Sequence, residues 1–372
     1  MPLVVPLPAP LAGIPWRMLV PLTALVCFGA AVLYSAAGGS FHPYASSHLL
    51  RYAVFLAMAV AISYVPRAWP PLAAYPFYGV VLFLLVLVEA IGAFGGGIQA
   101  WLEIGPVRIQ PSELMKPAVV LVMASYFHSL PPAAIGTWRA IVPPAALVAV
   151  PMLLVLVQPD LGTALAIGFG SAVMLFLAGL PVRWFALGGV AAVVLTPLAY
   201  FFGLHEYQQR RVTTFLDPES DPLGSGYHIT QSKIAIGSGG ITGKGFGEGS
   251  QSHLNYLPEP HTDFVFATMA EEWGLIGGLM VLLVFGIVLR WGWTVAREAP
   301  DRFSRLLAGG MTATIFFFVA INLMMVMGLA PVVGIPLPFM SHGGSSMMTN
   351  MICIGTLMMI DRWSRQPSTA HS

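Results

Sequence analysis

Long apolar runs separated by short polar connections dominate the pattern along this chain of 372 residues. A helix that crosses the hydrocarbon core of a bilayer needs about 20 predominantly apolar residues. Ten segments approach that length: Met18–Ala36, Leu49–Val65, Leu72–Phe94, Glu113–Phe127, Ala140–Val157, Leu161–Leu180, Val182–Phe202, Phe264–Leu289, Arg305–Leu329 and Gly344–Ile360. The pattern predicts an all-α integral membrane protein with about ten transmembrane helices, in a single polytopic domain over residues 1–372.

Composition supports this class, because 57% of the residues are hydrophobic and only 9% are charged. The net charge of +1 gives no reason to expect a nucleic-acid partner. Cys27 and Cys353 both lie inside apolar runs, which excludes a conventional exposed disulfide and suits no metal site. The first fifteen residues lack a basic segment, so the first apolar run is expected to be a retained span and not a signal peptide.

The distribution of arginine predicts the orientation. With the N-terminus inside, ten of the 17 basic residues flank cytoplasmic helix ends, whereas ten of the 16 acidic residues lie on the outer side. Cytoplasmic loops of membrane proteins carry an excess of Lys and Arg. The chain is therefore predicted to place both termini in the cytoplasm.

One outer connection is much longer than the others and runs over residues 203–262, between the seventh and eighth predicted helices. Its aromatic and apolar residues predict an ordered, functional loop, with a short helix from about Thr230 to Ile236. The glycine-rich run at residues 237–249 fails the Walker spacing, because Lys244 is followed by Gly245. Plain turn structure and a turn that exposes its backbone to a sugar or phosphate both stay open for this run.

The polar stretch Gln251–Phe264 ends where an apolar run begins at Val265, and it contains Glu259 and Asp263. Ionisable groups at the edge of lipid usually perform chemistry or hold structure. Asp263 is the candidate catalytic residue; the alternative is a carboxylate that only benefits from the dipole of the following helix. Glu271 and Glu272, two turns deeper, are expected to form interhelical hydrogen bonds or ion pairs.

Three further polar clusters fall on the same outer side. Arg108–Lys116 places Ser112 as a helix N-cap and Glu113 three residues before Lys116, and Gln158–Gly162 offers Asp160 as a cap or a cavity residue. The run Pro331–Ser346 breaks its helix with prolines and glycines, which at membrane depth must be buried in protein or line a wet cavity. If the fourth, sixth, eighth and tenth helices begin at one outer rim, these groups converge on one cavity.

These motifs resemble the SEDS family (shape, elongation, division and sporulation), and its rod-shape members more than its division members. The resemblance rests on Gln158-Pro-Asp-Leu-Gly162, on the run from Leu216 to Gly240, on Leu257-Pro-Glu-Pro-His-Thr-Asp-Phe264 and on Gly334-Ile-Pro-Leu-Pro338. It covers nearly the whole chain in order. It implies a peptidoglycan glycosyltransferase of the inner membrane that polymerises lipid II into a growing glycan strand on the periplasmic side during cell elongation. The implied partners are a class B penicillin-binding protein, which supplies transpeptidase activity, and the elongation machinery.

Residue by residue, the resemblance makes Asp263 the essential aspartate. It implies that the cavity contains Arg108, Glu113, Lys116, Gln158, Asp160, Lys233, Gln251, Glu259 and His261. The family's Ser-Tyr-Gly-Gly-Ser corresponds to Ser341–Ser345 here, with His342 in place of tyrosine, and we include Ser341 and Ser345 among the expected substrate-binding residues. Pro260 is a second departure, at a position that is commonly basic or alanine in relatives.

The chemistry also follows from the residues. A sugar hydroxyl that attacks an anomeric carbon and expels a diphosphate needs one carboxylate base and cations that stabilise the departing charge. Asp263 offers the base, and the outer cations are Arg108, Lys116, Arg210, Arg211 and Lys233. The sequence assigns no cofactor, and a requirement for Mg²⁺ or Mn²⁺ stays open.

Other functional classes stay open as well. A transporter or flippase for the same lipid-linked precursor would also contain broken helices and a polar cavity. Against a carrier, the ionisable residues gather at one end of the predicted helices, whereas alternating access needs groups that can be reached from both sides. A scaffold whose long loop only binds partners predicts that Asp263 is dispensable, and a division-type family member is a further alternative.

Overall fold

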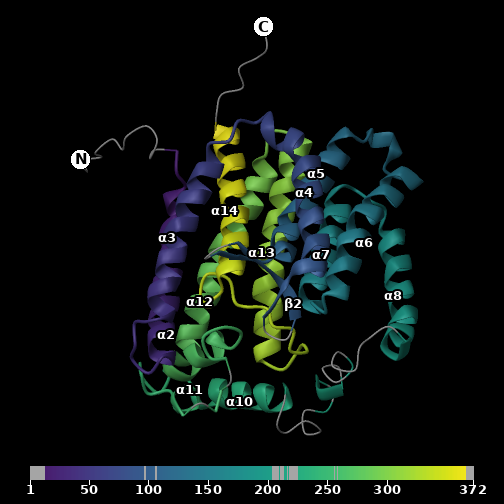
Figure 1. Ribbon diagram of the computed structural model, residues 1–372. Coiled ribbons are helices and arrows are strands. Elements are labelled where there is room, and N and C mark those ends of the chain that lie inside the picture. The colour runs from purple at the N-terminus through teal and green to yellow at the C-terminus, as the bar shows by residue number, and fades with distance from the viewer. Residues whose placement is uncertain are drawn as a thin grey trace, which may run out of the picture.

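The computed structural model describes residues 13–95, 98–104, 107–202, 209, 213–215, 217, 225–254, 256–257 and 259–365. Long helices run roughly side by side in one bundle (Figure 1). The helices are α2 (Trp16–Ala36), α3 (Tyr44–Ser63), α4 (Trp69–Ile91), α5 (Pro111–Ser129), α6 (Val142–Val157), α7 (Leu161–Leu177), α8 (Val182–Phe202), α10 (Ser225–Ser238), α11 (Ser250–His253), α12 (Val265–Glu298), α13 (Arg302–Val326) and α14 (Gly344–Arg365).

Each predicted apolar segment lies mostly on one of these helices, although Leu72–Phe94 runs past α4 into β1, and the class of an all-α membrane protein is confirmed at this level. Among the described residues, six helical segments are long and apolar enough to cross a membrane: α2, α3, α4, Trp138–Val157, α12 and α13. α7 and the first part of α8 are shorter apolar helices. The count of ten membrane crossings and the N-in, C-in orientation stay predictions.

Close packing of α14 against α3 shows how the bundle interior is built. A Cβ atom on Gly355 of α14 would lie 2.8 Å from the Cα atom of Ala59, so only glycine permits this approach. Small residues allow helix backbones to come close where apolar lipid supplies no hydrophobic drive between helices. α13 packs against α12, α7 and α5, which places it inside the bundle.

A small antiparallel sheet between α4 and α5 was not predicted from the sequence. Its strands are β1 (Ala93–Gly95), β2 (Ile98–Ile104) and β3 (Val107–Ile109), with β2 in the middle. Ala100 and Leu102 of β2 are buried, and β2 packs on α4 and α5. The sheet therefore covers one part of the bundle end at which α4 stops and α5 starts.

The long connection before α12 contains more helix than predicted. α10 spans Ser225–Ser238, which includes and extends the expected helix at Thr230–Ile236. α10 and the short α11 lie across one end of the bundle (Figure 1). At the opposite end α2 begins and α14 stops, so these two helix ends lie on one side of the bundle.

Candidate active site

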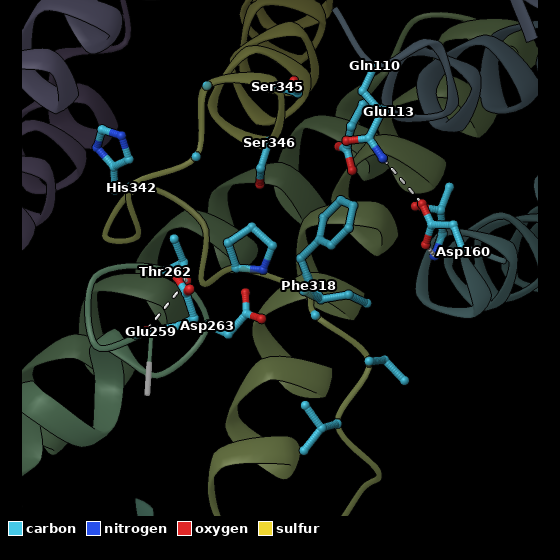
Figure 2. Close-up of a pocket in the computed structure, with 18 of the residues that line it drawn as sticks. Gln110, Glu113, Asp160, Glu259, Thr262, Asp263, Phe318, His342, Ser345 and Ser346 are labelled. Atoms are coloured by element: carbon cyan, nitrogen blue, oxygen red, sulfur yellow. Dashed lines mark hydrogen bonds between the residues drawn. The ribbon is translucent and has the colours of Figure 1, made fainter. Parts of the chain in front are cut away.

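A cavity of about 720 Å³ opens at the end of the bundle where α5, α7 and α14 begin. Its wall includes Glu113 from α5, Asp160 from the start of α7, and Asp263 from the segment that precedes α12. These three carboxylates come from elements far apart in the sequence and surround one space (Figure 2). The predicted convergence on a single cavity is thus observed for these residues.

Asp263 is held through its backbone. The Nδ2 group of Asn322 on α13 donates a hydrogen bond to the carbonyl oxygen of Asp263 at 2.9 Å and a second one to the carbonyl oxygen of Ile335 at 2.7 Å. Asn322 is fully buried, so it fixes two loops to α13. Gly334 lies beside the carboxylate, since a Cβ atom built on it would be 3.6 Å from Asp263 Oδ2. Asp263 therefore presents a half-buried carboxylate to the cavity from a fixed backbone.

Glu113 and Lys116 form a buried ion pair at the cavity wall, with Lys116 Nζ 2.6 Å from Glu113 Oε1. The ammonium also lies 4.3 Å from the ring centroid of Phe318, and the second carboxylate oxygen of Glu113 has no hydrogen-bond partner among the described residues. Glu113 lines the cavity, whereas Lys116 is buried and does not line it. The expected N-cap role of Ser112 is wrong, because α5 begins at Pro111 and Gln110 occupies the cap position without a side-chain hydrogen bond.

Asp160 has the two roles that the sequence left open. Its Oδ1 atom accepts a hydrogen bond from the Thr163 backbone at 2.9 Å as the N-cap of α7, and Oδ2 accepts from Gln110 Nε2 at 3.3 Å within the cavity wall. Gln158 behaves differently: it is buried, donates to the carbonyl oxygen of Leu85 at 3.0 Å and does not line the cavity. Its observed contact ties α6 to α4.

Two predicted charged groups are found at the cavity mouth. Arg108 lines the wall and pairs with Glu103 at 2.7 Å. Glu259 lines the wall too, and its Oε2 atom accepts from Thr262 Oγ1 at 3.1 Å. Glu259, which precedes Pro260, adopts a left-handed backbone with φ of 47°.

His261 supports the turn without lining the cavity. Its ring stacks on Tyr44 with centroids 4.0 Å apart, and its Nε2 atom lies 3.4 Å from Glu259 Oε2. Burial lowers the pKa of His261, while the Glu259 carboxylate opposes that shift. The ring therefore joins α3 to the segment that carries Asp263.

Other predicted binding residues lie outside the cavity wall. Lys233 is exposed on α10, the backbone N–H of Gln251 is bound by Glu271, and Ser341 Oγ donates to the carbonyl oxygen of Thr262 at 2.6 Å. Ser345 does line the cavity, next to Ser346 (Figure 2). Arg210 and Arg211 fall outside the described residues. Binding roles for all of these stay predictions.

Arg51 was not predicted as a site residue from the sequence. The Nη1 group of Arg51 lies 3.1 Å from His342 Nε2, and His342 lines the cavity. Burial, followed by the nearby Arg51 guanidinium, lowers the pKa of His342 to about 4. His342 is thus neutral at neutral pH and can accept a hydrogen bond from Arg51.

Glu272 accepts a hydrogen bond from Ser35 Oγ of α2, as the interhelical interpretation predicts, whereas Glu271 pairs with Lys244 of the glycine-rich loop. Lys244 and Gly245 donate their backbone N–H groups to the carbonyl oxygens of Glu271 and Glu272, at 3.0 and 3.1 Å. α12 is interrupted at Gly274, whose φ is 61°, and a Cβ atom there would lie 2.4 Å from the Gly243 nitrogen. These contacts favour turn structure for the loop, with its glycines allowing a close backbone approach.

The described residues contain no group of three or more His, Cys, Asp or Glu side chains arranged to hold a metal ion. The four carboxylates of the cavity come from α5, from the N-cap of α7 and from the segment before α12, which carries both Glu259 and Asp263. A requirement for Mg²⁺ or Mn²⁺ therefore stays an open expectation.

Comparison with known proteins defines the class. Residues 14–366 match the family described as "Cell cycle protein", that of FtsW, RodA and SpoVE, and the chain belongs to this family. It is 43% identical over 348 residues to the peptidoglycan glycosyltransferase MrdB of Escherichia coli K12, covering 92% of each chain. It is 39% identical over 287 residues to stage V sporulation protein E of Bacillus subtilis, covering 76% of this chain and 77% of that protein.

Solved structures agree with the sequence comparison. One is a chain from a study of the structural coordination of polymerization and crosslinking by a peptidoglycan synthase complex, with a TM-score of 0.82, 32% identity and coverage of 95% and 99% of the two chains. Another is the rod-shape-determining protein RodA of Thermus thermophilus, with a TM-score of 0.69, 29% identity and coverage of 95% and 98%. The predictions of the family and of a peptidoglycan glycosyltransferase are confirmed.

Proposed function

We propose that this glycosyltransferase polymerises lipid II, with Asp263 as the general base. The observation that carries the proposal is the cavity in which Asp263, Glu113 and Asp160 meet at one end of a membrane-type helix bundle. A concave site that combines apolar walls with a few convergent polar groups is the usual form of a substrate site. The cavity opens at one end of the bundle, which suits a substrate whose lipid stays in the membrane and whose sugars project from it.

In the proposed reaction a sugar hydroxyl attacks the anomeric carbon of a lipid-linked donor. The new bond forms between that oxygen and that carbon, the bond from carbon to the diphosphate oxygen breaks, and Asp263 takes the hydroxyl proton. A positioned general base contributes about 10²–10⁴-fold to the rate. Undecaprenyl diphosphate leaves as an anion, so no strong acid is required.

Positive groups in the cavity support stabilisation of the leaving diphosphate. Arg108 lines the wall, and α14 begins there with Gly344, Ser345 and Ser346, so its first backbone N–H groups and dipole face this end. The Nε atom of Arg51 lies 3.5 Å from the position that a Cβ atom on Gly344 would take. Lys116 is already neutralised by Glu113, so we assign it to holding that carboxylate.

The orientation and the partners belong to the same proposal. The excess of arginine at the other helix ends supports placing the cavity on the periplasmic face of the inner membrane. The similarity to a chain of a peptidoglycan synthase complex supports a class B penicillin-binding protein as the crosslinking partner. The similarity to MrdB and RodA supports a role in elongation.

A test in detergent separates an enzyme from a carrier, because solubilised protein has no two sides between which to move a lipid. Purified protein is incubated with labelled lipid II, and the products are resolved by length. We expect glycan strands from the native chain and none above background from Asp263→Asn. A native protein that folds and binds lipid II but forms no polymer would favour the carrier.

A further inference from the structure

The outer sheet carries an aromatic and ionic face of which the proposed reaction uses only Arg108. Side chains alternate between the two faces of a strand, so Trp101 and Glu103 of β2 share one face while Ala100 and Leu102 take the other. Ala100 and Leu102 are buried against the bundle. Trp101 and Glu103 are therefore on the face that looks away from that packing.

Trp101 lines the same cavity as Asp263, and its side chain is only half-buried. Within the part of the chain that the structure describes, the indole makes no hydrogen bond and no contact with another aromatic ring. Tryptophan in a protein interior usually finds a partner for its N–H group. Among the described residues the indole N–H of Trp101 has no partner, so this donor and the exposed part of the ring can both contact a ligand in the cavity.

An ion pair stands next to the indole. Glu103 and Arg108 are opposite each other in the β2–β3 register, and their Oε1 and Nη2 atoms are 2.7 Å apart. Both side chains are largely exposed, and Arg108 lines the cavity with Trp101. The flat apolar indole thus lies beside a hydrogen-bond acceptor, the Glu103 carboxylate, and a planar donor, the Arg108 guanidinium. These two charged groups hold each other in place.

This combination matches the chemistry of a pyranose ring. Such a ring has an apolar face of C–H groups, which an indole can cover, and a rim of hydroxyl and acetamido groups, which charged side chains bind strongly. We propose that the face formed by Trp101, Glu103 and Arg108 is a sugar-binding subsite that holds a hexosamine ring of the glycan substrate. The ligand class rests on the proposed function; the site itself rests on the cavity and the sheet.

The test measures binding apart from turnover. The probe is a soluble tetramer of β-1,4-linked N-acetylglucosamine, and binding is followed by saturation-transfer NMR on detergent-solubilised protein carrying Asp263→Asn. Loss of an aromatic contact of roughly 1.4 kcal/mol corresponds to about a tenfold change in affinity. We therefore expect Trp101→Ala to weaken binding about tenfold or more, and Trp101→Phe to retain most of the affinity.

Trp138→Ala is the matched control. Trp138 is an exposed tryptophan that precedes the start of α6, whereas the other end of α6 leads to the cavity residues Pro159 and Asp160. Equal tetramer binding by the Trp101→Ala and Trp138→Ala proteins would overturn the subsite, as would the absence of binding by the parent protein. A lower thermal stability of Trp101→Ala with unchanged binding would make the indole a packing or membrane-interface residue instead.

Activity provides the second readout. With Asp263 intact, Trp101→Ala should raise the KM for lipid II several-fold and leave kcat less affected, because the contact is made before and during the reaction. Full activity of Trp101→Ala alongside an inactive Asp263→Asn would overturn the subsite and leave the proposed function standing. Activity of Asp263→Asn would instead remove the general base and leave the binding result intact.

Discussion

Glu271 of α12 and Lys244 of the glycine-rich loop form an ion pair, with Lys244 Nζ 2.5 Å from Glu271 Oε1. The same carboxylate accepts from Ser250 Oγ at 3.0 Å and from the Gln251 backbone at 3.1 Å, so it holds the start of α11. α11 leads directly into the segment that ends at Asp263. Glu271 is fully buried and lies outside the cavity, which makes it a residue that positions the site from behind.

Glu271→Gln should therefore reduce polymerisation without removing a group that touches substrate. The amide keeps the shape but loses the charge that binds Lys244, and leaving buried polar groups poorly paired costs about 1–3 kcal/mol. We expect a lower melting temperature and a lower kcat. Lys244→Arg keeps the cation and should retain more of both than Lys244→Met. Equal values for Lys244→Arg and Lys244→Met would show that the ion pair does not matter.

Asp263→Asn tests the general base most directly. The amide keeps the volume of the side chain and cannot accept the hydroxyl proton, so the rate of strand formation should fall at least about a hundredfold. Asp263→Glu moves the carboxylate and should keep a fraction of the activity. Asn322 binds the carbonyl oxygen of residue 263, so both variants keep this backbone contact, and their thermal unfolding checks that they fold. Near-normal polymer from Asp263→Asn would end the assignment.

The buried Glu113–Lys116 pair predicts strong coupling between two substitutions. Removing one partner of a buried ion pair leaves an uncompensated charge and costs about 3–5 kcal/mol. Lys116→Met and Glu113→Gln should each destabilise the protein, and the double variant should be more stable than the sum of the two effects predicts. Thermal unfolding of the four proteins in one detergent gives this double-mutant cycle. Additive effects would mean that the two groups do not pair.

The helices could be predicted from the sequence because apolar runs of membrane length have few alternatives. The sheet could not, since β1 and β3 have only three residues each and show no alternating pattern of their own. Among site residues, Asp263, Glu113 and Asp160 were found by their charge beside apolar runs. Whether a polar or charged side chain faces the cavity or a neighbouring helix depends on packing, which is why Lys116 and Gln158 do not line the cavity although the sequence placed them there.

Residues that act through distant partners were the hardest to predict. Arg51 and His342 are 291 positions apart, and Lys244 and Glu271 are 27 apart, so no local pattern connects them. Trp101 was hidden for a similar reason, because only the sheet brings it to the cavity that Asp263 shares. The glycine-rich loop was open to two interpretations until its contact with the broken α12 was seen.

His342 predicts a dependence of stability on pH. Its pKa is lowered to about 4 from an ordinary value of 6.5, mainly by burial and then by Arg51. The unfolded chain therefore binds a proton at a higher pH than the folded chain does, so stability falls as the pH drops from about 6.5 toward 4. His261, whose pKa is lowered as well, contributes in the same direction. His342→Tyr should show a smaller loss of melting temperature between pH 7.5 and pH 5; an unchanged loss would contradict the assignment.

The orientation can be checked with single cysteines at the two ends of the bundle. Thr230 on α10 and Ala133 in the short helix Pro132–Ala134 are both exposed. Each is changed to cysteine in a Cys27→Ala background, because Cys27 is exposed whereas Cys353 is buried. In intact spheroplasts an impermeant thiol reagent should label Thr230→Cys and leave Ala133→Cys unlabelled until the membrane is opened. The background protein without an added cysteine is the control for labelling of Cys353. The reverse pattern would place the cavity in the cytoplasm, where a periplasmic polymerase cannot have its active site.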